Sequence, residues 1–288
     1  MIIVSHGDKL TEMEQAGTSV PINRNGSSMT TAGGSRISSG CIAGVIAALV
    51  HGGCGTARTV DAGPEGRDLS LDLGGAAMQF VWIDALQGWA GKFEVTNGEY
   101  RHFDPGHDSQ AFTHVTTQER LTLDDDRQPV VYVSYDDAVR FADWLNRAGA
   151  DQVPEGYRVR LPSGDEWSAL AQCGDEDRLH PWGDDWPPPP DWNYHGAEGA
   201  SGWLKLDGHD DGFPVSCPVE RSGRNDWGLY GVGGNVWEWT SEQRDASRVV
   251  RGTSWNYAKP SNLRCAADHL NVPSDRVNVI GFRLVILQ

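Results

Sequence analysis

The chain after residue 70 is a series of short apolar runs separated by glycine, proline and aspartate. Runs of about four to eight residues that are rich in β-branched and aromatic side chains are typical of β-strands. Such runs occur at residues 78–83, 92–95, 129–133, 157–161, 235–239, 248–251 and 281–286. No internal repeat is visible. The pattern therefore predicts a domain built on short strands.

Two helices are predicted by their start signals. Ser134 and Asp137 have the spacing of a capping box, and so do Ser163 and Glu166. After the first box, apolar residues recur at helical spacing and form one stripe: Ala138, Phe141, Ala142 and Leu145. Gly149 is placed to end this helix. The second helix is shorter, and its predicted buried side consists of Trp167, Leu170 and Ala171.

Residues 174–226 contain hardly any periodic segment, and the run Pro187–Pro190 excludes both a helix and a central strand there. Long segments of this kind are uncommon in compact domains and usually have a function. This one is rich in aspartate: Asp184, Asp185, Asp191, Asp207, Asp210 and Asp211. Oxygen ligands on irregular backbone suit calcium. For any single aspartate, a solvated acidic surface is the simpler interpretation.

Composition and charge narrow the function classes. The 288 residues are 39% hydrophobic and 22% charged, which is typical of a globular protein. Forty acidic against 24 basic side chains give a formal charge of -16, so we expect no nucleic-acid partner and no anionic membrane surface. Small cations or basic substrates fit this charge better. The five cysteines form no CxxC pair, so a zinc knuckle has no support.

The first part of the chain resembles an export signal. No segment reaches the roughly 18 to 20 apolar residues of a membrane-spanning helix, but residues 41–50 form a short apolar run between Arg36 and small residues. Its position suits a signal if translation starts at Met29. Cys54 follows two glycines, as at a bacterial lipoprotein cleavage site, and is the candidate for a lipid anchor, although His51 replaces the usual aliphatic residue. The alternative is a buried helix.

These features predict three parts of the chain. Residues 1–54 are expected to form an upstream segment with the export signal, residues 55–70 a linker, and residues 71–288 the folded domain. The mature protein is then exported to the periplasm, the extracellular space or a lipid-anchored position.

Nine short motifs point to a family. In order, they are residues 91–97, 129–134, 160–167, 181–183, 228–230, 234–239, 251–255, 263–266 and 281–283. Together they resemble the formylglycine-generating enzymes, also called sulfatase-modifying factors. The resemblance implies an α+β fold of the atypical C-type-lectin-like kind, with short strands, two main helices and long ordered loops. It also suggests why there are 12 tryptophans, since large rigid rings can hold loops that lack backbone ladders.

The chemistry of that family requires more than the fold. Formylglycine generation uses two cysteine thiolates to bind copper(I), a soft metal that thiolates select. In this chain the corresponding interval, residues 256–263, has no cysteine. Tyr257 stands where the first thiolate is expected, Asn262 or a gap where the second is expected, and Cys265 matches a neighbouring cysteine outside the copper pair. Copper and formylglycine-generating activity are therefore not expected.

An oxidoreductase with altered metal ligands is the alternative hypothesis. The iron-dependent sulfoxide synthases of the same superfamily take histidine ligands largely from an additional helical domain, for which this chain has no room. His102, His107 and His114 are clustered in the sequence, but their irregular spacing is more typical of a solvated loop.

The resemblance implies a structural calcium site. The first calcium site of the family corresponds to the side chains of Asn193 and Asp211 and the carbonyl oxygens of Tyr194 and Phe213. Such a mixture of side-chain and backbone oxygens suits calcium. The second family site has less support because Gly231 replaces a side-chain ligand. There, Glu238 is equally well interpreted as a hydrogen-bonded acid between two core tryptophans.

The remaining candidate is a ligand groove with hydroxyl, amide and aromatic groups: Trp237, Ser254, Trp255, Asn256, Tyr257, Arg264 and Asn271. Such groups suit recognition of a peptide or carbohydrate without chemistry. Ser254 and Trp255 are equally well explained as a structural turn. Arg251, Arg264 and Arg283 are better interpreted as partners of buried acids than as a substrate clamp. We therefore expect an exported ligand-binding or accessory module.

Overall fold

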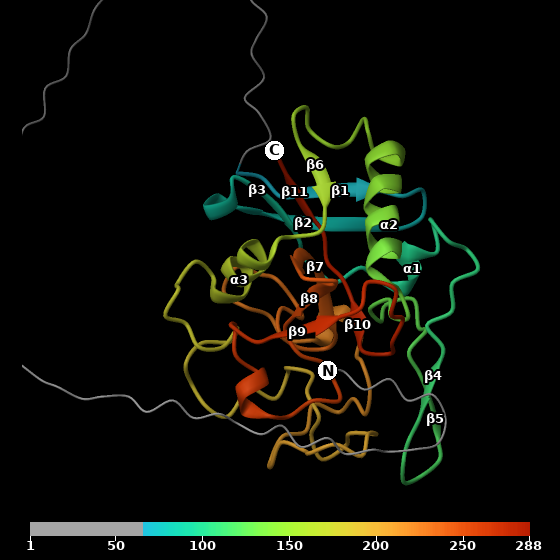
Figure 1. The fold of residues 1–288 in the computed structure, drawn as a ribbon, viewed down its shortest axis with the longest axis vertical. Coiled ribbons are helices and arrows are strands. Elements are labelled where there is room, and N and C mark those ends of the chain that lie inside the picture. Colours follow the sequence, from blue (N-terminus) through green and yellow to red (C-terminus); the bar gives the residue numbers. More distant parts are fainter. Residues whose placement is uncertain (1–65) are drawn as a thin grey trace, which may run out of the picture. The chain divides into compact units, whose positions relative to one another are not determined.

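The computed structural model describes residues 66–288, and its first layer is a five-stranded antiparallel sheet (Figure 1). The strand order is β1-β2-β3-β11-β6. The strands are β1 (Leu69–Asp72), β2 (Ala77–Ile83), β3 (Gly88–Gly91), β6 (Arg158–Arg160) and β11 (Val285–Leu287). The last strand of the chain, β11, lies between β3 and β6, so the C-terminus joins two segments that are far apart in the sequence.

A second sheet has the order β10-β7-β8-β9. Its strands are β7 (Trp237–Arg244), β8 (Ser247–Arg251), β9 (Asp268–Asn271) and β10 (Ile280–Gly281). A separate hairpin consists of β4 (Ala111–Thr113) and β5 (Arg120–Thr122). Three short 3-10 helices are η1 (Asp84–Leu86), η2 (Val219–Arg221) and η3 (Pro260–Asn262). No helix in residues 66–288 is both long and apolar enough to cross a bilayer.

Both predicted helices are confirmed, and their capping boxes explain where they begin. The helices are α1 (Asn97–Tyr100), α2 (Tyr135–Ala148) and α3 (Gly164–Gln172). In α2, Ser134 accepts from the Asp137 amide while the Asp137 carboxylate accepts from the Ser134 amide. Ser163 and Glu166 do the same at α3. The predicted stripe of α2 is buried and packs into the main core. The predicted α+β class with two main helices is therefore confirmed.

Two strand predictions are wrong, and the strand predicted at residues 281–286 is divided between β10 and β11, which belong to different sheets. Residues 92–95 and 129–133 have no strand ladder, although Val95, Val130, Val131 and Val133 are buried. The two segments instead form isolated backbone hydrogen bonds. The Val130 amide donates to the Val95 carbonyl, and the Val95 amide donates to the Phe282 carbonyl. Tyr132 has a positive φ of 57°, which interrupts extended backbone. Their apolar composition reflects burial in the core and not sheet pairing.

The segment between α3 and β7 is irregular apart from η2, as the sequence predicts. Aromatic rings hold it together. The ring of Trp182 lies 5.5 Å from that of Trp192 and 5.7 Å from that of Tyr194, with its plane inclined to theirs by 62° and 64°. Gly223 is required beside Trp192, because a Cβ there would overlap the indole and its φ is +80°. Large buried rings thus replace a backbone ladder in this half of the domain.

Candidate functional site

The seven predicted groove residues differ in their solvent exposure. Trp237, Ser254, Trp255 and Asn271 are buried, Asn256 and Tyr257 are half-buried, and Arg264 is exposed. The Ser254 hydroxyl donates to Asn256 Oδ1 at 2.8 Å, and the Tyr257 amide donates to the Ser254 carbonyl. Only Asn256, Tyr257 and Arg264 therefore present side-chain surface to a ligand.

Tyr257 lies within a group of four rings that we call the Tyr257 cluster: Trp203, Trp237, Tyr257 and His269. Ring centroids are 6.3 Å apart for Trp203 and Tyr257 and 6.2 Å apart for Trp237 and Tyr257. His269 lies 4.7 Å from Trp237, nearly perpendicular to it. Trp203 is 50% exposed. The sequence analysis did not select Trp203 or His269, because no local pattern places either residue near Tyr257.

Trp255 and Arg264 do not join this cluster. The Trp255 ring packs on Phe112 at 5.0 Å, and its indole nitrogen donates to the Asn278 carbonyl. These contacts agree with the structural interpretation of the Ser254–Trp255 turn. Arg264 forms no ion pair within residues 66–288, so its predicted role as the partner of a buried acid is wrong.

The four residues of the predicted calcium site do come together. Asp211 Oδ2 accepts from the Tyr194 amide at 3.0 Å and from Asn193 Nδ2 at 3.1 Å. Asp211 Oδ1 accepts from the Phe213 amide at 2.8 Å. Asn193 and Tyr194 are fully buried. One aspartate thus joins the two ends of the loop between residues 193 and 213.

Unpaired oxygen atoms surround this crossing. Asn193 Oδ1 and both carboxylate oxygens of Glu198 are buried without a hydrogen-bond partner. Glu198 faces Asp211 and Asp210, and burial followed by these two negative charges raises the pKa of Glu198 to about 7. Asn193 Nδ2 donates to Asp211 and to the Val215 carbonyl, so Asn193 Oδ1 is the oxygen left free for a further partner. Sequence reasoning missed Glu198, which has no motif of its own.

The side-chain oxygens of Asn193, Glu198 and Asp211 are of the kind that calcium accepts. Within residues 66–288, no three or more His, Cys, Asp or Glu side chains are grouped to hold a metal ion. His107 instead bonds to Ser109 and the Val131 carbonyl, and His114 accepts from the amides of Thr116 and Thr117. A site at Asn193 and Asp211 relies on amide and carbonyl oxygens in addition to carboxylates, which is the mixture that calcium accepts.

Glu238 lies in a different environment and has complete partners. Its Oε2 accepts from the Trp167 indole at 2.7 Å and from Arg283 Nε at 2.8 Å, and its Oε1 accepts from Arg283 Nη2 at 2.7 Å. Both charged side chains are completely buried. The structure therefore agrees with the interpretation of Glu238 as a hydrogen-bonded core acid and confirms Arg283 as the partner of a buried acid.

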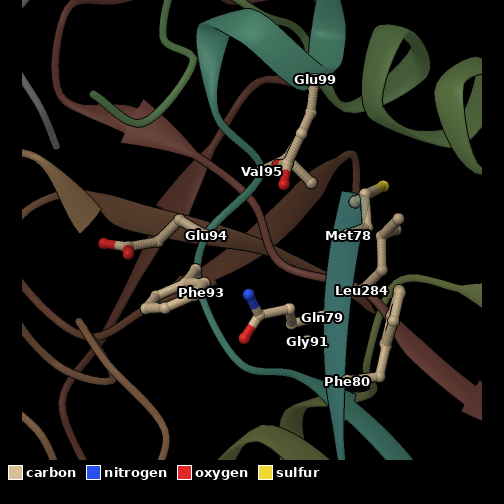
Figure 2. A pocket seen from close by; sticks show the side chains of 9 residues that line it. All are labelled: Met78, Gln79, Phe80, Gly91, Phe93, Glu94, Val95, Glu99 and Leu284. Atoms are coloured by element: carbon tan, nitrogen blue, oxygen red, sulfur yellow. The ribbon is translucent and has the colours of Figure 1, made fainter. Parts of the chain in front are cut away.

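Glu94 lies beside this pair and has no hydrogen-bond partner for either carboxylate oxygen. Burial raises its pKa to about 8, although the charge of Arg283 acts in the opposite direction. A Cβ at Gly231 would overlap the Glu94 carboxylate, so the glycine leaves room for it. Glu94 lines a 10 Å³ cavity together with Met78 and Leu284, and Figure 2 shows its side chain extending away from these two residues. Glu94 is therefore a neutral acid in the core at pH 7.

The three cysteines of the described region lie in the core or at the end of α3. Cys217 is buried, its amide donates to Asn235, and burial raises its pKa well above the usual value. Cys265 packs in the core group of Trp167, and burial raises its pKa to about 12. Cys173 ends α3. All three are free thiols, and each has a raised pKa.

Comparisons with known proteins extend these observations. The sequence profile described as the sulfatase-modifying factor enzyme 1-like domain matches residues 48–287. A curated relative from Bos taurus, "Inactive C-alpha-formylglycine-generating enzyme 2", is 32% identical over 164 residues, covering 54% of this chain and 49% of the relative. The "Formylglycine-generating enzyme" of Mus musculus is 31% identical over 175 residues, covering 54% and 43%. The chain thus spans about half the length of these curated relatives.

Solved structures share the fold at low sequence identity. "Treponema denticola variable protein 1" has a TM-score of 0.58 and 17% identity, and the match covers 77% of this chain and 99% of the other. PvdO from Pseudomonas aeruginosa has a TM-score of 0.52 and 20% identity, covering 77% and 91%. The few helices and short strands of residues 66–288 therefore form an arrangement already seen in other proteins.

Proposed function

Because this chain belongs to the sulfatase-modifying factor family, whose domain profile covers residues 48–287, we propose that it is an exported ligand-binding or accessory module without formylglycine-generating activity. The observation that most directly supports this proposal is the environment of Tyr257. Aromatic rings surround this residue where the resemblance implies a copper thiolate. The three described cysteines lie in other surroundings and have raised pKa values, which disfavours thiolates.

The Tyr257 cluster supports binding without chemistry. Trp203 and Tyr257 offer accessible aromatic faces, while Asn256 supplies an amide beside them. Rigid aromatic side chains provide contact area at low entropic cost, and amides give direction to hydrogen bonds. A peptide or a carbohydrate fits this combination, which also agrees with the proposed lectin-like character of the fold. The relative named as an inactive formylglycine-generating enzyme supports a family role that does not require turnover.

Calcium is the cofactor in this proposal, and copper is not part of it. Asn193, Asp211 and the carbonyl oxygens of Tyr194 and Phe213 would hold the ion, with Glu198 as a further oxygen donor. When bound, calcium supplies positive charge to buried oxygens that have no protein partner. The chain's own residues then fix the two ends of the loop, so the role is structural.

Export is the other part of the proposal. It rests on the apolar run at residues 41–50 and on Cys54 as the candidate lipid anchor, both of which lie outside the described residues. The predicted start at Met29 and the boundaries at residues 54 and 70 rest on the same sequence pattern. Mass spectrometry of the mature N-terminus in the natural host tests them, and an intact residue 1–50 segment would refute export.

A peptide assay tests the functional proposal directly. The full chain is incubated with a fluorescent sulfatase-type cysteine peptide, copper(I) and oxygen, and both anisotropy and aldehyde formation are measured. We expect saturable binding without aldehyde, at least tenfold weaker binding for Tyr257→Ala, and unchanged binding for the control Trp186→Leu, a 48% exposed tryptophan outside the cluster.

Two results would decide against the module. Aldehyde formation would show formylglycine generation, and stoichiometric iron or copper in the purified protein together with oxygen consumption would establish the alternative oxidoreductase. If the peptide does not bind, the same anisotropy measurement with a labelled oligosaccharide tests the carbohydrate ligand. Failure of both probes would overturn the Tyr257 cluster as the binding site.

A further inference from the structure

A second cavity, separate from the Tyr257 cluster, has a volume of about 170 Å³. It is lined by five residues: Trp82, Ile83, Asp84, Ala85 and Trp227. The first four follow one another at the end of β2 and in η1, and Trp227 comes from the irregular segment before β7. This volume is well below the roughly 300 Å³ at which sites for drug-sized ligands begin. The cavity therefore suits a small chemical group.

Trp82 is held in a fixed orientation. Its indole nitrogen donates to Asp84 Oδ1 at 2.7 Å, and its ring meets Trp89 edge to face at 4.8 Å. Trp89 is itself fully buried, and its indole donates to the Arg67 carbonyl at 2.7 Å. The Trp82 ring is thus positioned by the sheet before any ligand arrives, which lowers the entropic cost of binding.

Trp227 is fixed from the opposite segment. Its amide donates to Oδ1 of the buried Asn225 at 3.1 Å. A Cβ at Gly174 would lie 3.1 Å from the Trp227 ring, so the indole packs closely on that glycine. Both tryptophans remain half-buried and keep part of their ring surface accessible. Two rigid segments thus each provide an indole to the same cavity.

The cavity has a negative charge and no protein cation. Asp84 is its single charged lining residue, and none of the five is basic. Within residues 66–288, Asp84 forms no ion pair, and the four cation-π contacts involve Phe93, Phe213 and Tyr135 and neither cavity tryptophan. Indole is the strongest cation-π partner among the side chains. Within residues 66–288, no positively charged side chain therefore pairs with Asp84 or lies on the two indoles.

We propose that this cavity binds a small organic cation through a quaternary ammonium group, with the two indoles contacting its methyl groups and Asp84 balancing its charge. A carbohydrate would need several polar partners, but Asp84 is the lone polar side chain besides the indoles. A bare metal ion would need more oxygen ligands than one carboxylate supplies. The formal charge of -16 attracts cations to the whole molecule. This inference does not depend on the proposed function.

Titration of the full chain with choline chloride, followed by calorimetry and by the indole N–H signals in NMR spectra, tests the proposal. We expect saturable binding near the millimolar range, with shifts confined to two tryptophans. The neutral isostere 3,3-dimethylbutan-1-ol should bind at least tenfold more weakly. Equal affinity for the isostere, comparable binding of methyl glucoside, or no saturation with choline would each overturn the proposal.

Variants separate the contribution of the Asp84 charge to choline binding from that of the tryptophan rings. Asp84→Asn keeps an acceptor for the Trp82 indole and removes the charge, so we expect about tenfold weaker binding in a protein that still folds. Trp227→Leu should abolish saturation, whereas Trp186→Leu, the matched control, should leave the affinity unchanged. An unchanged affinity in Asp84→Asn would refute the carboxylate's role. Binding of phosphatidylcholine vesicles without binding of choline would refute a free small molecule as the ligand.

Discussion

The carboxylate oxygens of Glu238 and Glu198 are both enclosed by protein, but only Glu238 pairs with an arginine. Arg283 makes three hydrogen-bonding contacts to Glu238, and it also donates from Nη1 to the Gly91 carbonyl and from Nη2 to the Tyr230 carbonyl. Glu198 instead faces Asp210 and Asp211, and its oxygens have no partner. The nearest base in that region is His209, 3.8 Å from Asp211.

The regions of Glu238 and Glu198 therefore show two ways of stabilising a buried acid. In the core between the two sheets, the charge is balanced inside the chain, so that region needs nothing from solution. At the loop crossing, Glu198 and Asp211 have no arginine or lysine partner within residues 66–288, and the base beside them is His209, 3.8 Å from Asp211. Gathering acids without a full positive charge is costly in a low-dielectric setting. The stability of the Glu238 region should therefore depend on Arg283, whereas the stability of the loop crossing at Glu198 and Asp211 should depend on a cation bound from solution.

The largest effect is expected when the internal cation is removed. Arg283→Met leaves Glu238 buried and unpaired, which typically costs about 3–5 kcal/mol of unfolding free energy. Urea denaturation at pH 7 measures this loss. The double variant Arg283→Met/Glu238→Gln should recover part of it, because no charge then remains in the pair.

The matched control for Arg283 is Arg158→Met. The Arg158 side chain is 69% exposed and pairs with Asp143 at 2.7 Å. Exposed pairs contribute about 0–1 kcal/mol, so we expect little change. If Arg283→Met destabilised the protein no more than Arg158→Met, the internal balance described above would be wrong.

A smaller effect is expected from calcium. At a concentration of 100 times Kd, an ion that binds only the folded state adds about 2.7 kcal/mol to the unfolding free energy. Addition of calcium to chelator-treated protein should therefore raise the melting temperature, and calorimetry should give one binding event. Asp211→Asn should abolish the increase, and Glu198→Gln should reduce the calcium affinity.

Asp207→Asn is the control for this second region. Asp207 is an exposed acid in the same loop and has no contact with the Asp211 crossing among the hydrogen bonds of the described residues. Its variant should keep the full calcium effect. No calcium binding by the chelator-treated wild type would remove the ion from the proposal, whereas equal losses in all three variants would indicate a diffuse charge effect.

The sequence predicted features that depend on near neighbours and missed those that depend on distant ones. The capping boxes at Ser134 and Ser163 involve residues three positions apart, so their signals are local. The strand at residues 92–95 was predicted from Phe93 and Val95, but Val95 forms single backbone bonds to Val130 and Phe282, a pairing that no local pattern reveals. The motif resemblance placed Asn193 and Asp211 together, but Glu198 and Trp203 lie in irregular backbone without a periodic signal.

The effect that is smallest per pH unit concerns Glu94, which tests whether the core around Arg283 is charge-balanced. Its pKa is raised to about 8 in the folded protein, from an ordinary value of 4.5, mainly by burial. Between these two pH values the folded state holds a proton that the unfolded state has lost, so Glu94 lowers stability progressively as pH rises through this window and no further above it. Glu94→Gln cannot lose a proton and removes this dependence.

Relative to wild type, Glu94→Gln should therefore gain unfolding free energy with rising pH, by at most about 1.4 kcal/mol per pH unit, the slope for one proton. Urea denaturation of both proteins between pH 5 and pH 9, with the exposed Glu119→Gln as control, measures the difference. A difference that stayed constant over this range would mean that Glu94 is charged in the fold. Arg283 would then neutralise two carboxylates at once, and the contrast with the loop crossing would be even greater.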